Sequence, residues 1–329
     1  MYLITGGAGF IGSNIAAALD ECGDDIVIVD WLGTSDFKWR NIAKRRIRAI
    51  VRPEECIEFV EENAADVSGI FHMGAISATT ETDVDLIVRS NINLSSALWA
   101  AAAKYGIPFV YASSAATYGD GSLGFQDRFD EEYLSQLRPL NAYGWSKHVF
   151  DRMVLASIKR GEPAPPVWAG LKFFNVYGPN EYHKGSQRSV AVQLHTQIRA
   201  DARARLFRSD NPDYADGGQL RDFVWVGDCV EVALWLMKAG EPQSGLYNVG
   251  SGEARSFRDK AEIIFRNVGA PVEIEYVDLP KNLQGKYQYY TCAPLEKLRL
   301  AGYNQPMTSL EDGLQRYVLD HLEQSDIFV

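Results

Sequence analysis

The stretch TGGAGFIG at residues 5–12 follows a short apolar run, Tyr2–Thr5, and opens a stretch with helical spacing of its apolar residues, Ile11–Cys22. Its glycines at positions 6, 9 and 12 keep a GxxGxxG spacing. Such glycines permit a tight turn, a close approach of backbone N–H groups to a pyrophosphate, and close packing of the helix on the strand. The stretch therefore predicts a strand, a phosphate-binding turn and a helix, with candidate contacts at Gly6, Gly9, Phe10, Ile11 and Gly12.

The first half of the chain alternates short apolar runs with helical patterns. This alternation predicts α/β architecture, with a Rossmann-type doubly wound parallel sheet whose two faces are covered by helices. Strands are expected at residues 26–30 (IVIVD), 68–72 (SGIFH), 107–113 (IPFVYAS) and 167–174, and helices near 85–105 and 143–160.

After residue 175 the pattern changes, and loop-forming residues become frequent. We expect a smaller interleaved α/β substrate lobe, because sheet-like segments return later in the chain. The predicted dinucleotide-binding domain is 1–174 plus about 223–250, and the predicted substrate-binding lobe is 175–222 plus about 251–329. Strands are expected at 223–226 and 245–250, and helices at 228–239, 256–267 and 309–322.

The composition excludes several classes of protein. The 329 residues carry 33 basic and 43 acidic side chains, a formal net charge of −10, which disfavours general binding to nucleic acids or anionic membranes. No apolar run is long enough to span a bilayer, and the N-terminal residues show no signal-peptide pattern. A cytoplasmic protein is therefore expected. The four cysteines and five histidines show no metal-ligand spacing, so no metal site is expected.

Asp30 ends the second predicted strand, about twenty residues after the glycine turn, where an acidic side chain can bind the adenosine ribose of a dinucleotide. That carboxylate favours NAD. Lys38 and Arg40 follow closely and can neutralise the 2′-phosphate of NADP, so the choice between NAD and NADP is open from the residues alone. The segment after His72 should lie at the same sheet edge, with Asn91 opening the next helical stretch. The further candidates are Trp31, Met73, Gly74, Ala75, Ile76 and Ser77.

Tyr143 and Lys147 are four residues apart, which places them on one face of a helix. An ammonium near a phenol favours the phenolate and lowers the pKa of the phenol. Ser114, at the end of a predicted strand, can hydrogen-bond a reacting oxygen. A Ser–Tyr–Lys set beside a dinucleotide suits removal of a hydroxyl proton while hydride leaves carbon.

Together these motifs resemble the extended short-chain dehydrogenase/reductase family over the whole chain. The resemblance implies a Rossmann core and a smaller lobe that binds a nucleotide sugar. Sugar 4,6-dehydratases of that family carry an Asp-Glu pair between the strand-end Ser/Thr and the tyrosine of the YG step, where this sequence has Ala116-Thr117. An epimerase or reductase is therefore favoured over a dehydratase.

Longer segments are similar to the ADP-L-glycero-D-manno-heptose 6-epimerase family: HMGAISATTE (72–81), FNVYGPNEYHKGS (174–186), SVAVQLHTQ (189–197), RDFVWVGD (221–228) and GKYQYYT (285–291). This resemblance implies that Tyr143 and Lys184 are the acid/base pair, that Val176, Lys147 and Lys184 contact the cofactor, and that the cofactor is NADP. It also implies an ADP-heptose substrate, a homo-oligomer that is commonly a pentamer, and a role in the lipopolysaccharide core. The implied substrate contacts are Ser114, Asn175, Ser186, Gln193, Phe207, Arg221 and Tyr287.

Alternatives remain at this stage. Lys184 can instead be a diphosphate contact, and Phe207 a core aromatic residue. Asn211–Gln219 resembles an insertion relative to the family, and Trp31 stands where relatives often have Asn. The chain can also be another nucleotide-sugar epimerase, such as a UDP-hexose 4-epimerase, or a non-catalytic dinucleotide sensor. The intact Tyr143 and Lys147 disfavour the sensor.

Overall fold

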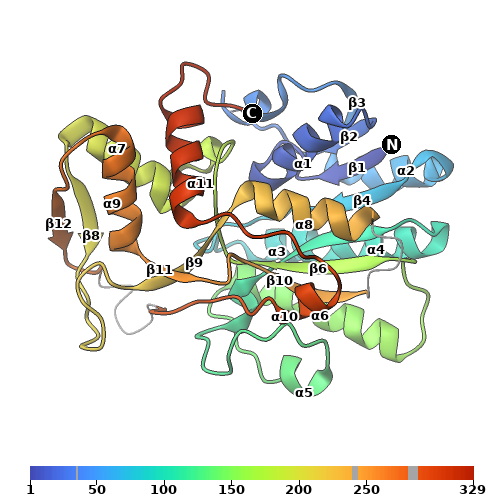
Figure 1. Cartoon of the computed structure of the whole chain (residues 1–329). Helices are drawn as coiled ribbons and strands as arrows, with labels where there is room; N and C mark the ends of the chain where they lie inside the picture. The colour runs from blue at the N-terminus through green and yellow to red at the C-terminus, as the bar shows by residue number, and fades with distance from the viewer. Residues whose placement is uncertain (35, 239–243, 281–287) are drawn as a thin grey trace.

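A computed structural model describes residues 1–34, 36–238, 244–280 and 288–329. Its centre is a seven-stranded parallel sheet in the order β10-β6-β5-β4-β1-β2-β3 (Figure 1). This confirms the predicted Rossmann-type fold. The strands are β1 (Tyr2–Thr5), β2 (Ile26–Val29), β3 (Ile47–Val51), β4 (Gly69–His72), β5 (Phe109–Ser114), β6 (Trp168–Phe173) and β10 (Gly245–Val249).

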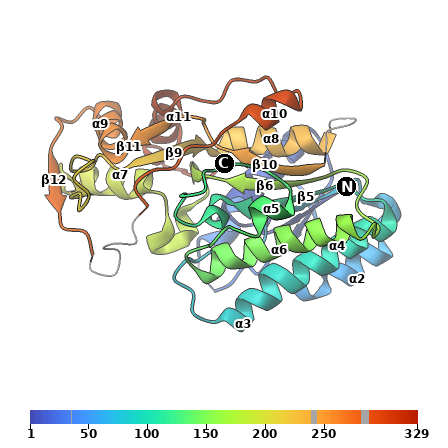
Figure 2. The ribbon, with the colours of Figure 1, turned by 90° about the horizontal axis from the view of Figure 1, so that it is seen from below.

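Helices cover both faces of this sheet, as the continuous apolar strands require. One face carries α1 (Phe10–Glu21) and α8 (Val226–Lys238), which pack against each other. The opposite face carries α2 (Cys56–Glu62), α4 (Leu94–Tyr105) and α6 (Ala142–Lys159), which lie together in the view from below (Figure 2). Short segments complete this part: η1 (Lys38–Ile42), η2 (Pro53–Glu55), η3 (Ala64–Asp66), α3 (Val84–Ile87), η5 (Ala115–Tyr118), α5 (Glu131–Leu134) and α10 (Glu296–Leu300).

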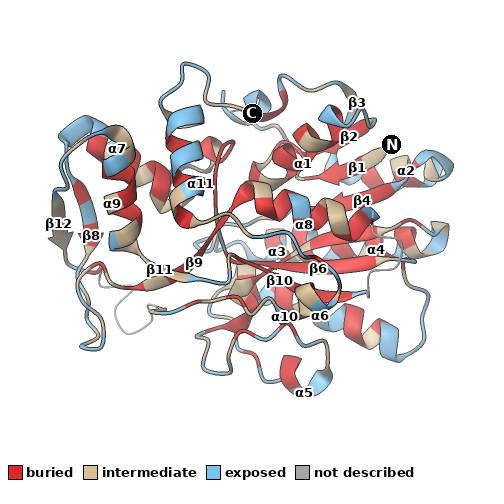
Figure 3. Cartoon of the chain, viewed as in Figure 1, coloured by how far each residue is buried: buried red, intermediate tan, exposed pale blue. Residues whose placement is uncertain are grey.

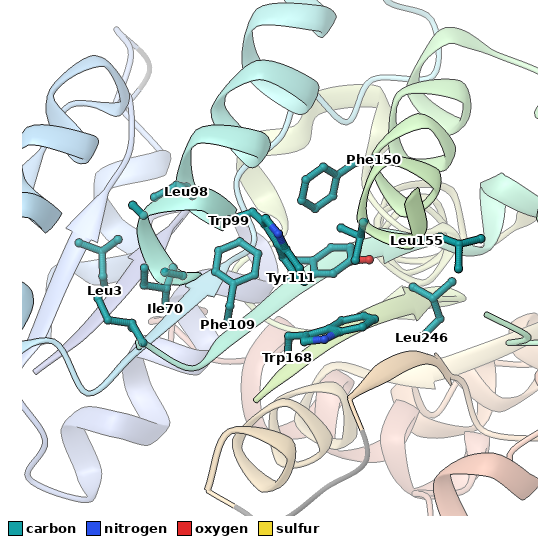
Figure 4. Close-up of a cluster of buried hydrophobic side chains, with 14 of the residues drawn as sticks. Leu3, Ile70, Leu98, Trp99, Phe109, Tyr111, Phe150, Leu155, Trp168 and Leu246 are labelled. Atoms are coloured by element: carbon teal, nitrogen blue, oxygen red, sulfur yellow. The ribbon is translucent and has the colours of Figure 1, made fainter. Parts of the chain in front are cut away.

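Aromatic side chains fill the core between the sheet and α4 and α6. The ring centre of Trp99 lies 6.0 Å from that of Phe109, and the ring centre of Phe150 lies 4.9 Å from that of Tyr111 (Figure 4). Strands β2 and β4 are buried along their whole length, and β1 and β5 are buried at all but one residue each (Figure 3). A rigid sheet thus supports the loops at its carboxyl ends.

A smaller lobe is built from segments that leave and rejoin the large sheet. A three-stranded sheet has the order β11-β9-β7, and β12 pairs with β8, while β10 returns to the edge of the large sheet (Figure 1). The observed elements are β7 (Asn175–Tyr177), η6 (Tyr182–Gln187), α7 (Val190–Asp201), β8 (Ala204–Phe207), β9 (Leu220–Trp225), β11 (Ala254–Ser256), α9 (Phe257–Val268), β12 (Ile274–Val277), α11 (Leu310–Arg316) and the π-helical η7 (Tyr317–Leu322).

Some details differ from the sequence predictions. The helix expected at 85–105 begins at Val84 and contains a π-helical segment, η4 (Val88–Asn93), so Asn91 lies inside a helical stretch instead of opening one. The predicted strand at 223–226 is β9, which belongs to the small sheet. The exact division of the chain into two domains remains a prediction. No helix among the described residues is long and apolar enough to cross a membrane.

Candidate active site at the carboxyl edge of the sheet

One cavity of about 760 Å³ runs along the carboxyl edge of the large sheet and into the smaller lobe. Ligands of doubly wound folds bind at this edge, where the strand order reverses, which here is between β1 and β4. Most of the predicted site residues line this cavity. They are Gly6, Gly9, Phe10, Ile11, Gly12, Asp30, Trp31, Lys38, Met73, Gly74, Ala75, Ile76, Ser77, Ser114, Tyr143, Lys147, Asn175, Val176, Lys184 and Ser186.

The glycine turn has no room for side chains. A Cβ on Gly12 would lie 2.2 Å from the carbonyl oxygen of Gly6, and a Cβ on Gly6, whose φ is +63°, would lie 2.6 Å from Cα of Gly74. The N-cap of α1 is Gly9, which makes no side-chain cap hydrogen bond, so the first turn of the helix offers its N–H groups to the cavity. This uncapped, positively polarised helix end fits the pyrophosphate of a dinucleotide.

Asp30 joins the glycine turn to a lysine. Its carboxylate accepts hydrogen bonds from the backbone N–H of Ala8 at 3.0 Å and from Lys38 Nζ at 2.6 Å. Lys38 lines the cavity, whereas the exposed Arg40 pairs with Asp36 and does not line it. Of the two basic side chains considered from the sequence, the structure therefore places Lys38 beside the carboxylate that is predicted to bind the ribose.

The loop after β4 is fixed by hydrogen bonds from both sides. The backbone N–H of Gly74 donates to Thr5 Oγ1 at 3.0 Å, and that of Ile76 donates to Asn91 Oδ1 at 2.8 Å. Asn91 also donates to Ser146 Oγ at 3.0 Å, and its side chain is buried. Asn91 does not line the cavity but ties the loop to α6, so its structural position is that of a support behind the predicted cofactor contacts.

Tyr143 and Lys147 lie one turn apart near the start of α6, whose N-cap Asn141 accepts a hydrogen bond from Gly144 at 2.8 Å. Burial lowers the pKa of Lys147 to about 8. Burial raises the pKa of Tyr143, and a hydrogen bond with Ser114 acts in the opposite direction. Burial outweighs this hydrogen bond, so the pKa of Tyr143 is raised in the structure, opposite to the lowering expected from Lys147.

A buried ion pair anchors the next turn of α6 to the sheet. Lys172 Nζ lies 2.8 Å from Asp151 Oδ2, and both side chains are fully buried. Asp151 also accepts hydrogen bonds from Ser113 at 2.7 Å and Tyr111 at 3.0 Å. Because Ser113 precedes Ser114 on β5, this network fixes the helix that carries Tyr143 against the strand that carries Ser114.

Lys184 enters the cavity from η6. Its ammonium lies 4.6 Å from the ring centre of Phe10, and burial lowers its pKa. Asn41 secures the segment to the dinucleotide lobe, because its Nδ2 lies 3.1 Å from the carbonyl oxygen of Asn180 and 3.1 Å from His183 Nδ1. A lowered pKa makes the amine of Lys184 easier to deprotonate, which suits a group that accepts and donates protons. The structure therefore brings Tyr143 and Lys184 to the walls of one cavity.

Some predicted substrate contacts do not line the cavity. Gln193 donates to the carbonyl oxygen of Arg188 at 2.8 Å, and Arg221 donates to the carbonyl oxygen of Leu220 at 2.8 Å. Phe207 lies on β8, also away from the cavity wall. Tyr287 lies outside the described residues. The substrate roles of Gln193, Phe207, Arg221 and Tyr287 remain predictions.

The sequence reading missed several residues of the wall. Lys260 had a detectable signal, because it lies one turn after Phe257 and one turn before Ile264, on the apolar stripe of α9, where a lysine is out of place. Other missed residues lie in the segments similar to the epimerase family but were not singled out there, among them Thr79, Thr80, Glu181, His183, Ser189 and Phe223. Gln187, Arg188 and Phe257 lie outside those segments.

Comparisons with known proteins agree with this geometry. The chain is 47% identical over 332 residues to an ADP-L-glycero-D-manno-heptose-6-epimerase of Nitratidesulfovibrio vulgaris, covering 100% of both chains, and 42% identical over 338 residues to one of Fusobacterium nucleatum, again covering 100% of both. The crystal structure of the Helicobacter pylori ADP-L-glycero-D-manno-heptose-6-epimerase is similar, with a TM-score of 0.78 and 29% identity over 96% of this chain and 94% of that one. The model of the NAD dependent epimerase/dehydratase family matches residues 2–250, and the chain belongs to that family.

Proposed function

We propose that this protein is an epimerase that inverts C6″ of ADP-D-glycero-D-manno-heptose to give ADP-L-glycero-D-manno-heptose. The observation that carries the proposal is the presence of Tyr143 and Lys184 on the walls of the cavity that also contains the glycine turn. The names of the full-length relatives support the choice of sugar.

Inversion of a carbinol carbon needs a planar intermediate. A nicotinamide held at the glycine turn and Lys147 would supply the chemistry for this, removal of hydride from C6″ to give an aldehyde and return of hydride to the other face. Because C6″ lies on a terminal group of the heptose, rotation about one bond presents the second face. The hydroxyl oxygen moves with this rotation, so one protein group cannot serve both positions well.

Two acid/base groups meet this need. Tyr143 and Lys184 serve the two positions of the oxygen: one accepts the hydroxyl proton during oxidation, and the other donates a proton as the hydroxyl is restored. Ser114 positions the oxygen through its hydroxyl group, which interacts with Tyr143. Lys147 would hold the ribose of the nicotinamide, and its positive charge would favour the ionised form of Tyr143.

NADP is the proposed cofactor. The carboxylate of Asp30 alone would repel a 2′-phosphate. However, Lys38 Nζ lies 2.6 Å from Asp30 Oδ1 and supplies a positive charge at the same place. The hydrogen bond from Ala8 to the other oxygen of Asp30 keeps that carboxylate turned toward the glycine turn. The homo-oligomer, commonly a pentamer, that the family resemblance implies is part of the same proposal.

The test is to incubate the purified protein with ADP-D-glycero-D-manno-heptose and to resolve the two C6″ epimers. A parallel reaction with UDP-glucose and UDP-galactose tests the nearest alternative. Interconversion of the ADP-heptoses alone is expected. Turnover of only the uridine sugars would assign the protein to the 4-epimerases instead.

A further inference from the structure

Lys260 is a buried lysine on the wall of the cavity. Its residue is 1% exposed, yet it lines the cavity together with Phe257, one helical turn earlier. Among the described residues, none forms an ion pair or hydrogen bond with its ammonium. The ammonium instead lies 3.5 Å from the ring centre of Phe223 and 4.8 Å from that of Tyr177. Aromatic faces recover only part of the cost of burying a charge.

The N-terminus of α7 reaches the same part of the cavity. Ser189 and Val190 both line it, and α7 packs against α9. Ser189 does not cap the first turn of α7. Instead its N–H and hydroxyl group donate to Glu181, the hydroxyl at 2.7 Å from Oε1. The first turn of α7 therefore presents uncapped N–H groups and the positive end of a helix dipole beside a cationic side chain.

Glu181 interacts with both Lys260 and the N-terminus of α7. Its carboxylate attracts Lys260 and is held by Ser189 and by the hydroxyl of Tyr317 at 2.9 Å. The attraction is too weak to offset burial, which lowers the pKa of Lys260 to about 7. Glu181 and Tyr177 on β7 are thus titratable side chains that face Lys260, and Tyr317 on η7 contacts Glu181.

Lys260 and the N-terminus of α7 belong to the smaller lobe. The glycine turn that fits the cofactor's pyrophosphate precedes α1 in the other lobe. A nucleotide sugar brings a second diphosphate into the cavity, and this anion needs its own positive partners. We propose that Lys260 and the N-terminus of α7 bind the diphosphate of the nucleotide-sugar substrate. The assignment rests on the proposed function, and it predicts that Lys260 takes up a proton when the substrate binds.

Isothermal titration of the NADP-saturated protein with ADP and with AMP tests this site, because only ADP has the second phosphate. Lys260→Met and Lys260→Gln should weaken ADP binding by about 10- to 100-fold, the loss typical of a charge-assisted contact, and should bring the affinities for ADP and AMP together. Arg258→Met, on the exposed side of α9, is the matched control and should leave ADP binding unchanged. Titrations at pH 7.5 in two buffers of different ionisation enthalpy should show proton uptake that both Lys260 variants lose.

A merely structural lysine would give a different result. If either folded variant, checked by circular dichroism, binds ADP within twofold of the unaltered protein and keeps its preference over AMP, the proposal is wrong. Titrations with UDP distinguish a failure of the proposed diphosphate site from a failure of the proposed function. If UDP binds more tightly than ADP and still depends on Lys260, the heptose assignment is wrong and the diphosphate site stands.

Discussion

The ammonium of Lys38 lies 2.6 Å from a carboxylate oxygen of Asp30, on the wall of the cavity where the adenosine of the cofactor is expected. This contact puts a positive charge beside an acidic side chain that alone would favour NAD, which supports the proposal that the cofactor is NADP. The side chain of Lys38 is 23% exposed, so it can shift from Asp30 toward a 2′-phosphate without unfolding of the segment.

Lys38→Met should therefore weaken NADP binding by about tenfold or more, because a charge-assisted contact is lost and Asp30 is left to repel the phosphate. NAD binding should change much less. Fluorescence titration with both reduced cofactors measures the two affinities. Arg40→Met is the control, because Arg40 pairs with Asp36 outside the cavity. An equal loss of NAD and NADP affinity in Lys38→Met would contradict this role.

Tyr143→Phe and Lys184→Met should each lower kcat on the order of 10²–10⁴-fold, because each removes one acid/base group. The double variant should be at least as impaired. Epimer formation followed by chromatography gives kcat, and cofactor titration shows whether the site is still formed. Lys104→Met removes an exposed lysine paired with Glu61 and should have no effect. Turnover that survives in the double variant would refute the assigned pair.

Gly12→Ala should abolish dinucleotide binding, because the added Cβ would lie 2.2 Å from the carbonyl oxygen of Gly6 and force the turn to move. Gly161→Ala is the matched control. Gly161 has a φ of +69° and open space around it, so the substitution should cost about 1 kcal/mol of stability and leave cofactor binding intact. Thermal unfolding and cofactor titration distinguish the two effects. Cofactor binding by Gly12→Ala at the unaltered affinity would show that the turn does not need this close contact.

The stability of the protein should depend on pH through Lys260. Burial lowers its pKa from 10.5 to about 7, so between these values the unfolded chain holds a proton that the folded protein lacks. Raising the pH through this window therefore favours the folded state, by at most about 1.4 kcal/mol per pH unit. The free energy of unfolding, measured in urea from pH 7 to 9.5, should rise more steeply for the unaltered protein than for Lys260→Met. Parallel curves would mean that Lys260 stays charged in the folded state.

The parts of the site that could be predicted from the sequence are those encoded by short local patterns. The glycine turn, the Tyr143–Lys147 pair and the strand-end Ser114 each depend on spacing within a few residues, and all line the cavity. The buried strands of the large sheet were recognisable for the same reason, because they are continuous apolar runs. β3 was missed because its sequence, IRAIV, contains an arginine and is only partly buried at the sheet edge.

The remaining wall of the cavity depends on contacts between distant segments. Arg188 follows η6, Phe223 lies on β9 and Lys260 lies on α9, and no local spacing relates them. The direction of the pKa shift of Tyr143 could not be predicted from its spacing to Lys147, because burial by the surrounding fold is its largest cause. In the same way, the supporting role of Asn91 depends on its position inside a π-helical segment.

The most direct test of the account is the fate of deuterium placed on C6″ of ADP-D-glycero-D-manno-heptose. If hydride leaves this carbon, stays on the bound cofactor and returns to the opposite face, the L-glycero product should retain the deuterium at C6″ in ordinary water, as seen by mass spectrometry. Loss of the label to solvent in step with epimerisation would contradict the hydride mechanism.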